Sequence, residues 1–434
     1  MSLVALKIEA EDWLRYSPLV RGLLARWHLA VGKRLPLGTP REIVRAIDRL
    51  CAAARLAAVT PQVLPIEKEI HRRVAQLGGA KFDWTEFEPS ADKKQLEKAV
   101  VLKPWISERE KGLVYISFEY QWIRLLHNCD LEAFARRYDL VVAPVWACPY
   151  SPVNFILPAI YPGRVFCHLS DPHDREILPR LSEKYVVVPL LCSSWVNPDL
   201  YQPAPFAQKD NDILMLANFG KYKRHHRLFA ALREMPREVR VRLIGQHNGA
   251  RTGATLKQEA RAWGVADQFV LTQNAPEDEV FQALARSKIS LILSQREGSC
   301  VAVVESLFAN TPVGLYAGAE VGSRQFINAK TGRFLQHHNL AAQLLDFLAH
   351  AHEYQPRQWA LDNQISCYGS SAVLNQAVKE TALAAGQEWS QDLAPFHWRP
   401  DPQLIHEADR RRMRPSYDEI KQRFGIELGV AGRR

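Results

Sequence analysis

Residues 287–313 read SKISLILSQREGSCVAVVESLFANTPV, and this stretch decides the fold that the sequence predicts. Its apolar run 289–294 is typical of a buried strand, and the apolar run 301–309 predicts a helix. The polar loop between them contains Gly298 and Ser299. A strand, a short loop and a helix in this order form the repeating unit of a parallel α/β sheet. The helix would therefore begin at the carboxyl edge of the sheet, where such folds bind ligands.

Two glutamates flank the start of this helix, Glu297 in the loop and Glu305 eight residues later. The first turn of a helix carries backbone N–H groups without intrahelical partners and the positive end of the helix dipole, which suits a diphosphate. A loop carboxylate and a helix carboxylate can reach different parts of one ligand. An ordinary α/β segment can also carry two acidic residues, so the spacing alone leaves both interpretations open.

Around this stretch, strands and helices alternate. Downstream of a polar, proline-bearing linker at 197–211, we expect strands at 212–218, 239–245, 268–272 and 289–294, with helices at 224–235, 254–263 and 277–286 between them. Upstream of the linker, strands are expected at 112–118, 139–146, 164–169 and 184–191, with a helix at 121–137. The alternation predicts two α/β domains, each with a mainly parallel sheet.

The two ends of the chain lack this alternation, and their predicted elements are helices. Helices are predicted at 41–58 and 66–77, and near the other end at 372–386 and 416–424. We therefore divide the chain into a helical N-terminal extension (1–110), an N-terminal α/β domain (111–200), a C-terminal α/β domain (211–385) and a C-terminal tail (386–434). A return of this tail to the N-terminal domain is one arrangement that we consider.

Composition places the chain among soluble folded proteins. It has 434 residues, 47% of them hydrophobic and 24% charged, and no apolar run reaches the roughly 18 residues that a spanning helix needs. The N-terminal residues become acidic too early for a secretion signal, and the seven cysteines include no C-x-x-C pair. We expect a cytoplasmic protein with reduced cysteines. The net charge of +9 indicates an anionic partner: a nucleic acid, a membrane surface or a phosphorylated small molecule.

The segment 212–335 resembles the C-terminal domain of the retaining GT-B glycosyltransferases of family 4. The resemblance rests on four elements in order: ILMLANFGKYKRHHRLFAAL with Lys223, then E297GSCVAVVE305, T311PVGLYAG and T331GRFL. It implies a GT-B fold, with two Rossmann-like, doubly wound domains that face each other across a cleft, here with a helical N-terminal extension. It also implies that the domain 111–200 lies on the acceptor side and that the domain 211–385 binds the nucleotide sugar.

The resemblance also implies roles for individual residues. Lys223 would neutralise the donor diphosphate, the amides of Gly298, Ser299 and Cys300 would cap its phosphates, and Glu305 would bind the ribose hydroxyls. Glu297 would contact the transferred sugar.

The chain departs from the family pattern at two places. Asn218 stands where the family usually has an arginine, and Lys221 is a candidate to supply the missing diphosphate contact. The family's glycine-rich loop after the first strand is also missing from FEYQWIRL. In the N-terminal half, His168 at the end of a strand is the candidate catalytic contact to the donor sugar together with Glu297. His173 competes with His168 for this role, and a purely structural histidine is the alternative for both.

The function implied is transfer of a sugar, hexosyltransferase-like, from a nucleoside-diphosphate sugar to a sugar, glycolipid or protein acceptor with retention of configuration. A place in bacterial surface polysaccharide or glycolipid synthesis follows from the family. We expect no cofactor and no metal, since the adjacent His225 and His226 face apart on a helix. The alternatives are a GT-B sugar-nucleotide epimerase and a non-catalytic basic nucleic-acid-binding protein. Nucleic acid is not the expected partner, because aromatic-basic RNA signatures and zinc ligands are absent from the sequence.

A peripheral contact with the inner face of the cell membrane is a further expectation. Within residues 1–80, many arginines recur among apolar residues that include Trp13, Leu23 and Trp27, a mixture that suits an anionic interface. The alternative is that these helices pack on the N-terminal domain and leave their arginines in solvent.

Overall fold

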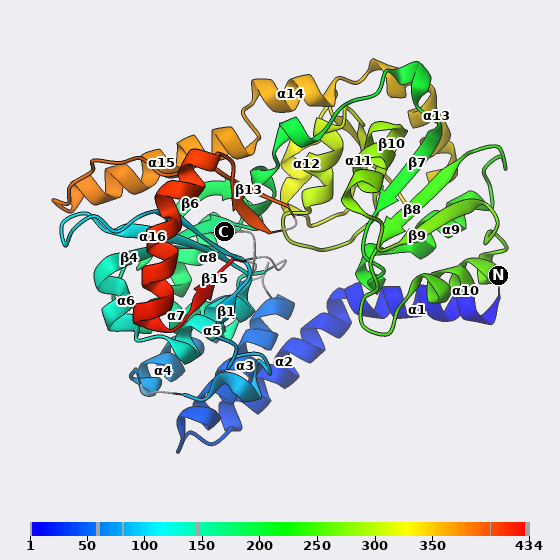
Figure 1. The fold of residues 1–434 in the computed structure, drawn as a ribbon. Coiled ribbons are helices and arrows are strands. Elements are labelled where there is room, and N and C mark those ends of the chain that lie inside the picture. Colours follow the sequence, from blue (N-terminus) through cyan, green and yellow to red (C-terminus); the bar gives the residue numbers. More distant parts are fainter. Residues whose placement is uncertain (1, 58–60, 80–81, 145–147, 400, 430–434) are drawn as a thin grey trace. The chain divides into compact units, whose positions relative to one another are not determined.

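The computed structural model describes residues 2–57, 61–79, 82–144, 148–399 and 401–429 (Figure 1). By contacts the chain divides into two compact units. The first consists of Met1–Ser17 and Val196–Ser366, and the second of Pro18–Trp195 and Cys367–Arg434. The chain therefore crosses between the units three times, at 17/18, 195/196 and 366/367.

The first unit contains a six-stranded sheet in the order β12-β11-β10-β7-β8-β9, with every neighbouring pair parallel. Its strands are β7 (Asn211–Leu216), β8 (Val241–Gly245), β9 (Phe269–Gln273), β10 (Ser287–Ile292), β11 (Val313–Tyr316) and β12 (Gly332–Leu335). The chain builds outward from β7 to β9 and then returns to the other side of β7 with β10. This reversal of strand order is the signature of a doubly wound sheet, as the sequence predicts.

Helices cover both faces of this sheet. On one face α9 (His225–Leu232), α10 (Gly253–Trp263) and α13 (Leu340–Ala349) bury their apolar sides in one continuous core. On the other face lie α11 (Glu277–Ala285) and α12 (Val301–Phe308), followed by α14 (Pro356–Asp362), which packs on α12. The first helix of the chain, α1 (Leu3–Tyr16), joins the core of the first face through Ala5.

The second unit contains a five-stranded sheet in the order β2-β3-β4-β5-β6. Its strands are β2 (Ala99–Lys103), β3 (Gly112–Ser117), β4 (Tyr138–Ala143), β5 (Val165–Leu169) and β6 (Tyr185–Leu191). The strand expected at 139–146 thus ends early, and residues 145–146 lie outside the described residues. β2 is antiparallel, and β3 to β6 are parallel and follow chain order, so the described strands of this sheet are not reversed about a switch point. The doubly wound order expected for both domains is therefore found in the first unit.

The helices of the second unit come from both of its chain segments. They are α2 (Pro18–Arg34), α3 (Pro40–Ala57), α4 (Val63–Leu77), α5 (Glu119–Asn128), α6 (Leu131–Arg137), α7 (Pro152–Ile160), α8 (Asp174–Leu181), α15 (Cys367–Ala384) and α16 (Glu407–Phe424). The single helix expected at 121–137 is divided because Asp130 accepts a hydrogen bond from the Ala133 amide at 3.1 Å and caps a new helix.

The tail 386–434 forms two short strand pairings within the second unit. β13 (Phe396–Trp398) pairs with β14 (Pro402–Leu404), and β15 (Glu427–Leu428) pairs with β1 (Gln95–Leu96). Residues 430–434 lie outside the described residues. Because the pairing of β1 with β15 joins residues more than 300 positions apart, the tail is part of the fold of the second unit.

The unit boundaries differ from those drawn on the sequence. The expected extension 1–110 does not form a separate part of the structure. Its helix α1 belongs to the first unit, its helices α2 to α4 belong to the second unit, and its strand β2 is part of the second unit's sheet. Likewise α15, expected in the C-terminal domain, belongs to the second unit. Helical periodicity shows which face of a helix is buried, but not which core receives it.

Two further features concern the surface. Among the described residues, no helix is long and apolar enough to cross a membrane.

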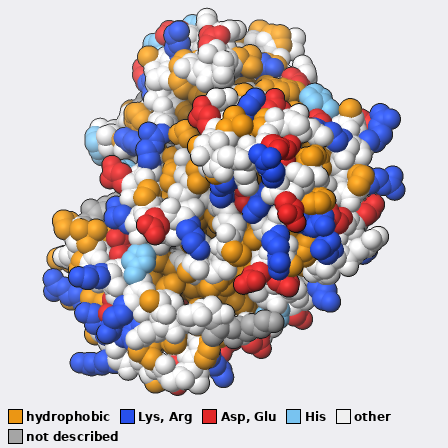
Figure 2. Space-filling model, turned by 90° about the vertical axis from the view of Figure 1, so that its left-hand side faces the viewer, with side chains coloured by type: hydrophobic (Ala, Val, Ile, Leu, Met, Phe, Trp, Pro, Cys, Tyr) orange, Lys and Arg blue, Asp and Glu red, His pale blue; other side chains and the backbone are white. Residues whose placement is uncertain are grey.

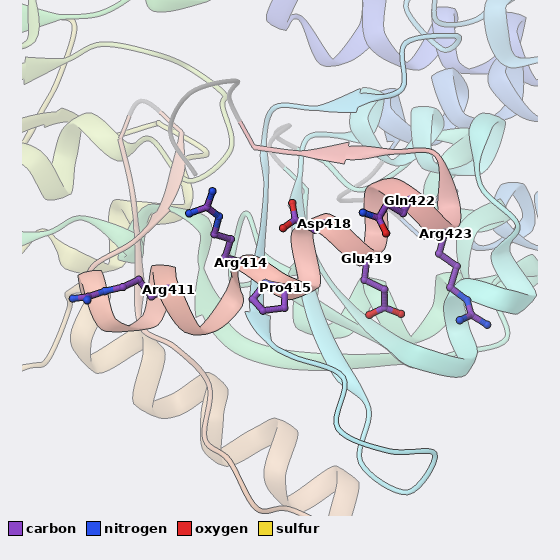
Figure 3. A pocket seen from close by; sticks show the side chains of 7 residues that line it. All are labelled: Arg411, Arg414, Pro415, Asp418, Glu419, Gln422 and Arg423. Atoms are coloured by element: carbon purple, nitrogen blue, oxygen red, sulfur yellow. The ribbon is translucent and has the colours of Figure 1, made fainter.

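A shallow hollow of about 670 Å³ lies along α16 and is lined by residues of that helix alone (Figure 3). Three arginines, Arg411, Arg414 and Arg423, line it. Arg414 and Arg423 project to opposite sides of the helix (Figure 3), so these two do not converge on one ligand position.

A buried ion pair holds the tail against the rest of the second unit. The Lys103 ammonium lies 2.7 Å from the Glu110 carboxylate, and both side chains are almost fully buried. Glu110 also accepts hydrogen bonds from the amide and hydroxyl of Ser390 at 2.7 and 2.8 Å. Burial would raise the pKa of Glu110, but Lys103 and Ser390 lower it to about 2. The carboxylate is therefore ionised throughout the neutral range.

We expect Glu110→Gln to lower the free energy of unfolding by roughly 3–5 kcal/mol, because it leaves the Lys103 ammonium buried without its anion. Urea denaturation of the full chain at pH 7 measures this loss. The double variant Lys103→Met/Glu110→Gln removes both charges and still accepts from Ser390, so it should recover most of the stability. A single variant as stable as the wild type would contradict the assignment.

Candidate functional site

The candidate site lies where the strand order of the first sheet reverses. β7 and β10 are parallel neighbours, with Ile213 opposite Ile289. The loops that follow them leave the same carboxyl edge of the sheet, and they carry Lys223 and Glu297 respectively. The carboxyl edge at such a reversal is the place where open α/β sheets bind their ligands.

The two loops meet in an ion pair. The Lys223 ammonium contacts the Glu297 carboxylate, and each side chain is 11% exposed. Burial alone would lower the pKa of Lys223, but the adjacent carboxylate raises it above its usual value. Burial would likewise raise the pKa of Glu297, and Lys223 instead lowers it. The site therefore holds one fixed cation and one fixed anion, largely shielded from water.

Local backbone geometry places these two residues. Lys223 ends a single 3-10 turn, Lys221–Lys223, and Arg224 then adopts a left-handed conformation with φ of 57° before α9 begins. In the second loop, Cys300 takes the same conformation with φ of 52° immediately before α12. Gly298, Ser299 and Cys300 thus lead directly into the first turn of α12, so the structure brings them together with Lys223 and Glu297 at one edge of the sheet.

The loop after β7 has little room at its base. A Cβ atom on Gly245, at the end of β8, would lie 1.9 Å from the Ala217 carbonyl oxygen. The Phe219 amide also donates to the Gln246 carbonyl at 2.8 Å. Glycine at this position lets the two chain segments approach closely, and that approach fixes where the Lys223 loop starts.

The other two polar candidates of this loop have partners of their own. The Asn218 amide donates to the Tyr222 hydroxyl at 2.7 Å and accepts from the Gly220 amide at 3.0 Å, so it shapes the turn. Lys221 is mostly exposed and forms an ion pair of 2.6 Å with Glu11 of α1. The structure therefore places Lys221 toward α1, apart from the Lys223–Glu297 pair.

Glu305 lies on α12 and is buried. Its carboxylate accepts a hydrogen bond from the Tyr201 hydroxyl at 3.1 Å. Tyr201 is itself buried and follows a short turn of the linker, Pro198–Leu200. The linker predicted from its prolines thus contributes a side chain to the domain, a contact that the sequence did not reveal.

Two threonines of the quoted motifs are structural. The buried hydroxyl of Thr311 donates to the Leu284 carbonyl at 2.7 Å, and that of Thr331 donates to the Phe326 carbonyl at 2.6 Å. The first bond joins the segment before β11 to α11, and the second joins the residue before β12 to the 3-10 turn Gly322–Phe326.

Sequence reasoning missed Arg224, which is buried next to Lys223. Its guanidinium donates to both carboxylate oxygens of Asp12 on α1, at 2.8 to 3.1 Å, and to the Gln295 side chain at 2.8 Å. Arg224 stands in the basic run K221YKRHHR227, while Asp12 lies in the acidic stretch E9AED12. Opposite charge was the available signal, but more than 200 residues separate the two runs.

The candidate histidines of the second unit have different environments. His168 is fully buried at the end of β5, stacks on Trp195 at 5.2 Å and accepts a hydrogen bond from the Trp195 indole at 3.3 Å. Burial lowers the pKa of His168 to about 3, so its ring is neutral at physiological pH. His173 is exposed and bonds to Asp171 at 2.6 Å.

His225 and His226 are both buried in the first turn of α9. Burial, with Arg251 and Lys223 nearby, lowers the pKa of His225 well below its usual value. His226 lies 3.6 Å from the Asp12 carboxylate. Among the described residues, no group of three or more histidine, cysteine, aspartate and glutamate side chains is arranged to hold a metal ion.

Residues 198–359 match the family described as Glycosyl transferases group 1. No curated protein matches the chain. Among solved structures, sucrose-phosphate synthase from Thermosynechococcus elongatus matches with a TM-score of 0.50 and 15% identity, over 63% of this chain and 74% of that chain.

Two other solved structures match with lower TM-scores. The pneumococcal O-GlcNAc transferase GtfA, in complex with UDP and GlcNAc, gives a TM-score of 0.42 at 16% identity, over 59% of this chain and 54% of that chain. HepE from Anabaena, in complex with UDP and glucose, gives 0.44 at 14% identity, over 58% and 80%.

The matched segment begins just before Tyr201, contains Lys223, Glu297 and Glu305, and ends within α14. It therefore covers the whole doubly wound sheet and both loops of the candidate site. We conclude that the chain has the GT-B fold and that its residues 198–359 are similar to the glycosyl transferases group 1 family.

Proposed function

We propose that the protein transfers a sugar from a nucleoside-diphosphate sugar to an acceptor hydroxyl with retention of configuration. The observation that carries this proposal is the Lys223–Glu297 pair at the strand reversal of the group 1 domain. A buried cation beside the first turn of a helix suits a diphosphate leaving group, since both favour negative charge.

Lys223 is the proposed diphosphate contact. In the free protein its charge is balanced by Glu297. A bound diphosphate would bring a new anion to this cation, and Glu297 would then be available to accept hydrogen bonds from hydroxyls of the transferred sugar. The amides of Gly298, Ser299 and Cys300 would bind phosphate oxygens, because they lie at the positive end of the α12 dipole.

Glu305 is the proposed ribose contact. A buried carboxylate suits a pair of neighbouring hydroxyls, because each of its oxygens accepts hydrogen bonds. The Tyr201 hydroxyl occupies one oxygen and orients the group. Lys221 is the weaker of the two lysine candidates, since it already pairs with Glu11 at the surface.

The proposed chemistry needs no dedicated base on the protein. The bond from the sugar's anomeric carbon to the diphosphate breaks, and the acceptor oxygen bonds to that carbon on the same face. The acceptor's proton passes to the departing diphosphate oxygen. The protein stabilises the leaving group electrostatically. We retain His168 as the proposed donor-sugar contact, ahead of His173, because its neutral ring has an Nε2 atom without a hydrogen-bond partner among the described residues.

The two alternatives make different predictions. An epimerase of the same fold would interconvert sugar nucleotides without an acceptor, so product analysis in the absence of acceptor tests it. A nucleic-acid-binding protein would need a basic surface. On the face drawn in Figure 2, Lys and Arg side chains are spread among Asp and Glu, which favours the small anionic donor over nucleic acid.

The first test is a thermal-shift screen with nucleoside diphosphates and their sugars. A ligand at 100 times its Kd stabilises the protein by about 2.7 kcal/mol. The responding base identifies the donor class for the variants below, and a protein that responds to none of these ligands would contradict the proposal.

Lys223→Ala should weaken nucleoside-diphosphate binding by about tenfold to a hundredfold, because a charge-assisted hydrogen bond contributes about 1.5–3 kcal/mol. Binding of the free nucleoside should hardly change. Calorimetry measures both, and Lys257→Ala, which removes an exposed lysine of the same unit, is the matched control. An equal loss for nucleoside and diphosphate would show that Lys223 acts through folding.

Glu297 and Glu305 should separate in kinetics. Glu305→Gln should weaken nucleoside and nucleoside diphosphate alike, since both carry the ribose. Glu297→Gln should leave diphosphate affinity equal or tighter, because it frees Lys223, and should lower turnover. Release of nucleoside diphosphate from the donor identified above measures turnover. The same defect in both variants would contradict the two roles.

We also propose peripheral attachment to anionic membranes, with a glycolipid acceptor and a place in surface glycan synthesis. In α2 the large apolar side chains Leu19, Leu23 and Trp27 are 78%, 66% and 53% exposed and recur every four residues along one face. The same helix carries Arg26, Lys33 and Arg34. Exposed apolar residues beside basic ones are typical of interfacial helices.

The wild type should therefore co-sediment with anionic vesicles at low salt, with less binding at high salt and none to neutral vesicles. Leu19→Ser/Leu23→Ser should lose most of this binding, whereas Val270→Ser, which changes an equally exposed residue of β9, should keep it. Absence of binding to either vesicle would favour a soluble or protein acceptor.

A further inference from the structure

The N-terminal helix α1 packs into the core of the first unit, which also contains the candidate site. Ala5 is completely buried in the core of this unit, and Ile8 packs against the same core. The Ser2 hydroxyl donates to the Ala262 carbonyl at the end of α10 at 3.0 Å. The chain enters the second unit immediately afterward, at Pro18. This single helix of the N-terminal region therefore belongs with the residues of the candidate site.

The acidic residues of α1 pair with basic residues of the run 221–227, which contains Lys223 and continues into α9. Glu11 pairs with Lys221 at 2.6 Å, and Glu9 pairs with Arg227 at 2.9 Å. The Asp12 carboxylate forms ion pairs with the guanidinium groups of Arg224 at 2.8 Å and Arg227 at 3.1 Å. The pairs of Glu9 and Glu11 are partly exposed, whereas Asp12 and Arg224 are both more than nine-tenths buried.

Asp12 is a permanent anion in this environment. Burial works to raise its pKa, yet the neighbouring His226 ring and Arg224 guanidinium hold the pKa well below its usual value. The buried guanidinium of Arg224 therefore faces an ionised carboxylate at neutral pH. A neutral side chain at position 12 would leave the guanidinium buried with no anion of its own.

Arg224 in turn joins the two loops of the candidate site. Its backbone follows Lys223 directly and has a positive φ, a conformation that a non-glycine residue adopts when its surroundings hold it there. Its side chain donates to Gln295, two residues before Glu297. The Gln295 carbonyl accepts from the Glu320 amide at 2.8 Å, and the Glu297 amide donates to the Glu320 carbonyl at 3.1 Å.

The loops after β7 and β10 are thus bridged twice, by Lys223 with Glu297 and by Arg224 with Gln295. We infer that Asp12 is a positioning residue of the donor site, because it holds Arg224 and so fixes the Lys223 loop in the geometry that receives the diphosphate. This inference rests on the proposed function. It extends the donor site to α1, where Asp12 would act without touching the donor.

The test compares Asp12→Asn with Glu11→Gln in the full chain. Both variants replace an acid of α1 by its amide, but only Asp12 is buried against Arg224. We expect Asp12→Asn to weaken nucleoside-diphosphate binding about tenfold in calorimetry, with free-nucleoside binding within about twofold of the wild type. Glu11→Gln should leave both affinities within about twofold. A merely structural role would lower the melting temperature and leave the ratio of the two affinities unchanged.

A double variant keeps the inference testable where Asp12→Asn alone folds poorly. Asp12→Asn/Arg224→Gln replaces the buried pair by two neutral groups and should show the same loss of diphosphate affinity as either single change, since coupled residues act as one unit. Asp12→Glu should restore part of the affinity.

The outcomes separate this inference from the proposed function. Unchanged or tighter diphosphate binding in Asp12→Asn, with Lys223→Ala still weakened, would overturn the inference alone. Tighter binding would mean that Asp12 competes with the diphosphate for Arg224. A wild type that binds no nucleoside diphosphate would overturn the proposed function and this inference with it.

Discussion

The parallel pairing of β7 with β10 is the constraint on which the candidate site depends. These strands are separated in sequence by β8 and β9, and they become neighbours because the chain returns to the middle of the sheet. Parallel strands end at the same edge, so the two loops that follow must meet there. Lys223 and Glu297 are paired for this reason, although 74 residues separate them. A sheet that continued past β9 in chain order would have kept the two loops apart.

Once the loops meet, electrostatics decides what the site can hold. Burial penalises each charge of the Lys223–Glu297 pair, and the pairing more than offsets that penalty in the pKa values of both groups. Such a pair loses much of its stabilisation when one partner is removed, yet a ligand that brings its own anion and hydroxyls can replace the internal contacts. Neighbouring Arg224 already binds Asp12 and Gln295 and therefore contributes order to the loop.

The second unit shows how distant segments complete a domain. Its sheet uses β3 to β6 in chain order, and the C-terminal tail returns to add β15 beside β1 and to place Ser390 on the buried Glu110 carboxylate. Hydrogen-bonding groups that are buried need partners, and the tail supplies them. His168 lies within this sheet against Trp195, where burial keeps its ring neutral.

The sequence by itself determined the features that depend on neighbouring residues. The apolar runs predicted β3, β7, β8 and β10, and the loop between β10 and α12 predicted where Glu297 would stand, because strand and helix periodicities are properties of short segments. Only the tertiary structure decided which core each helix joins. The helices α1 and α2 follow each other in the chain, but α1 belongs to the first unit, where Asp12 binds Arg224, and α2 belongs to the second unit. That contact joins residues 212 positions apart, and it depends on burial and charge complementarity in the folded chain, which no local pattern records.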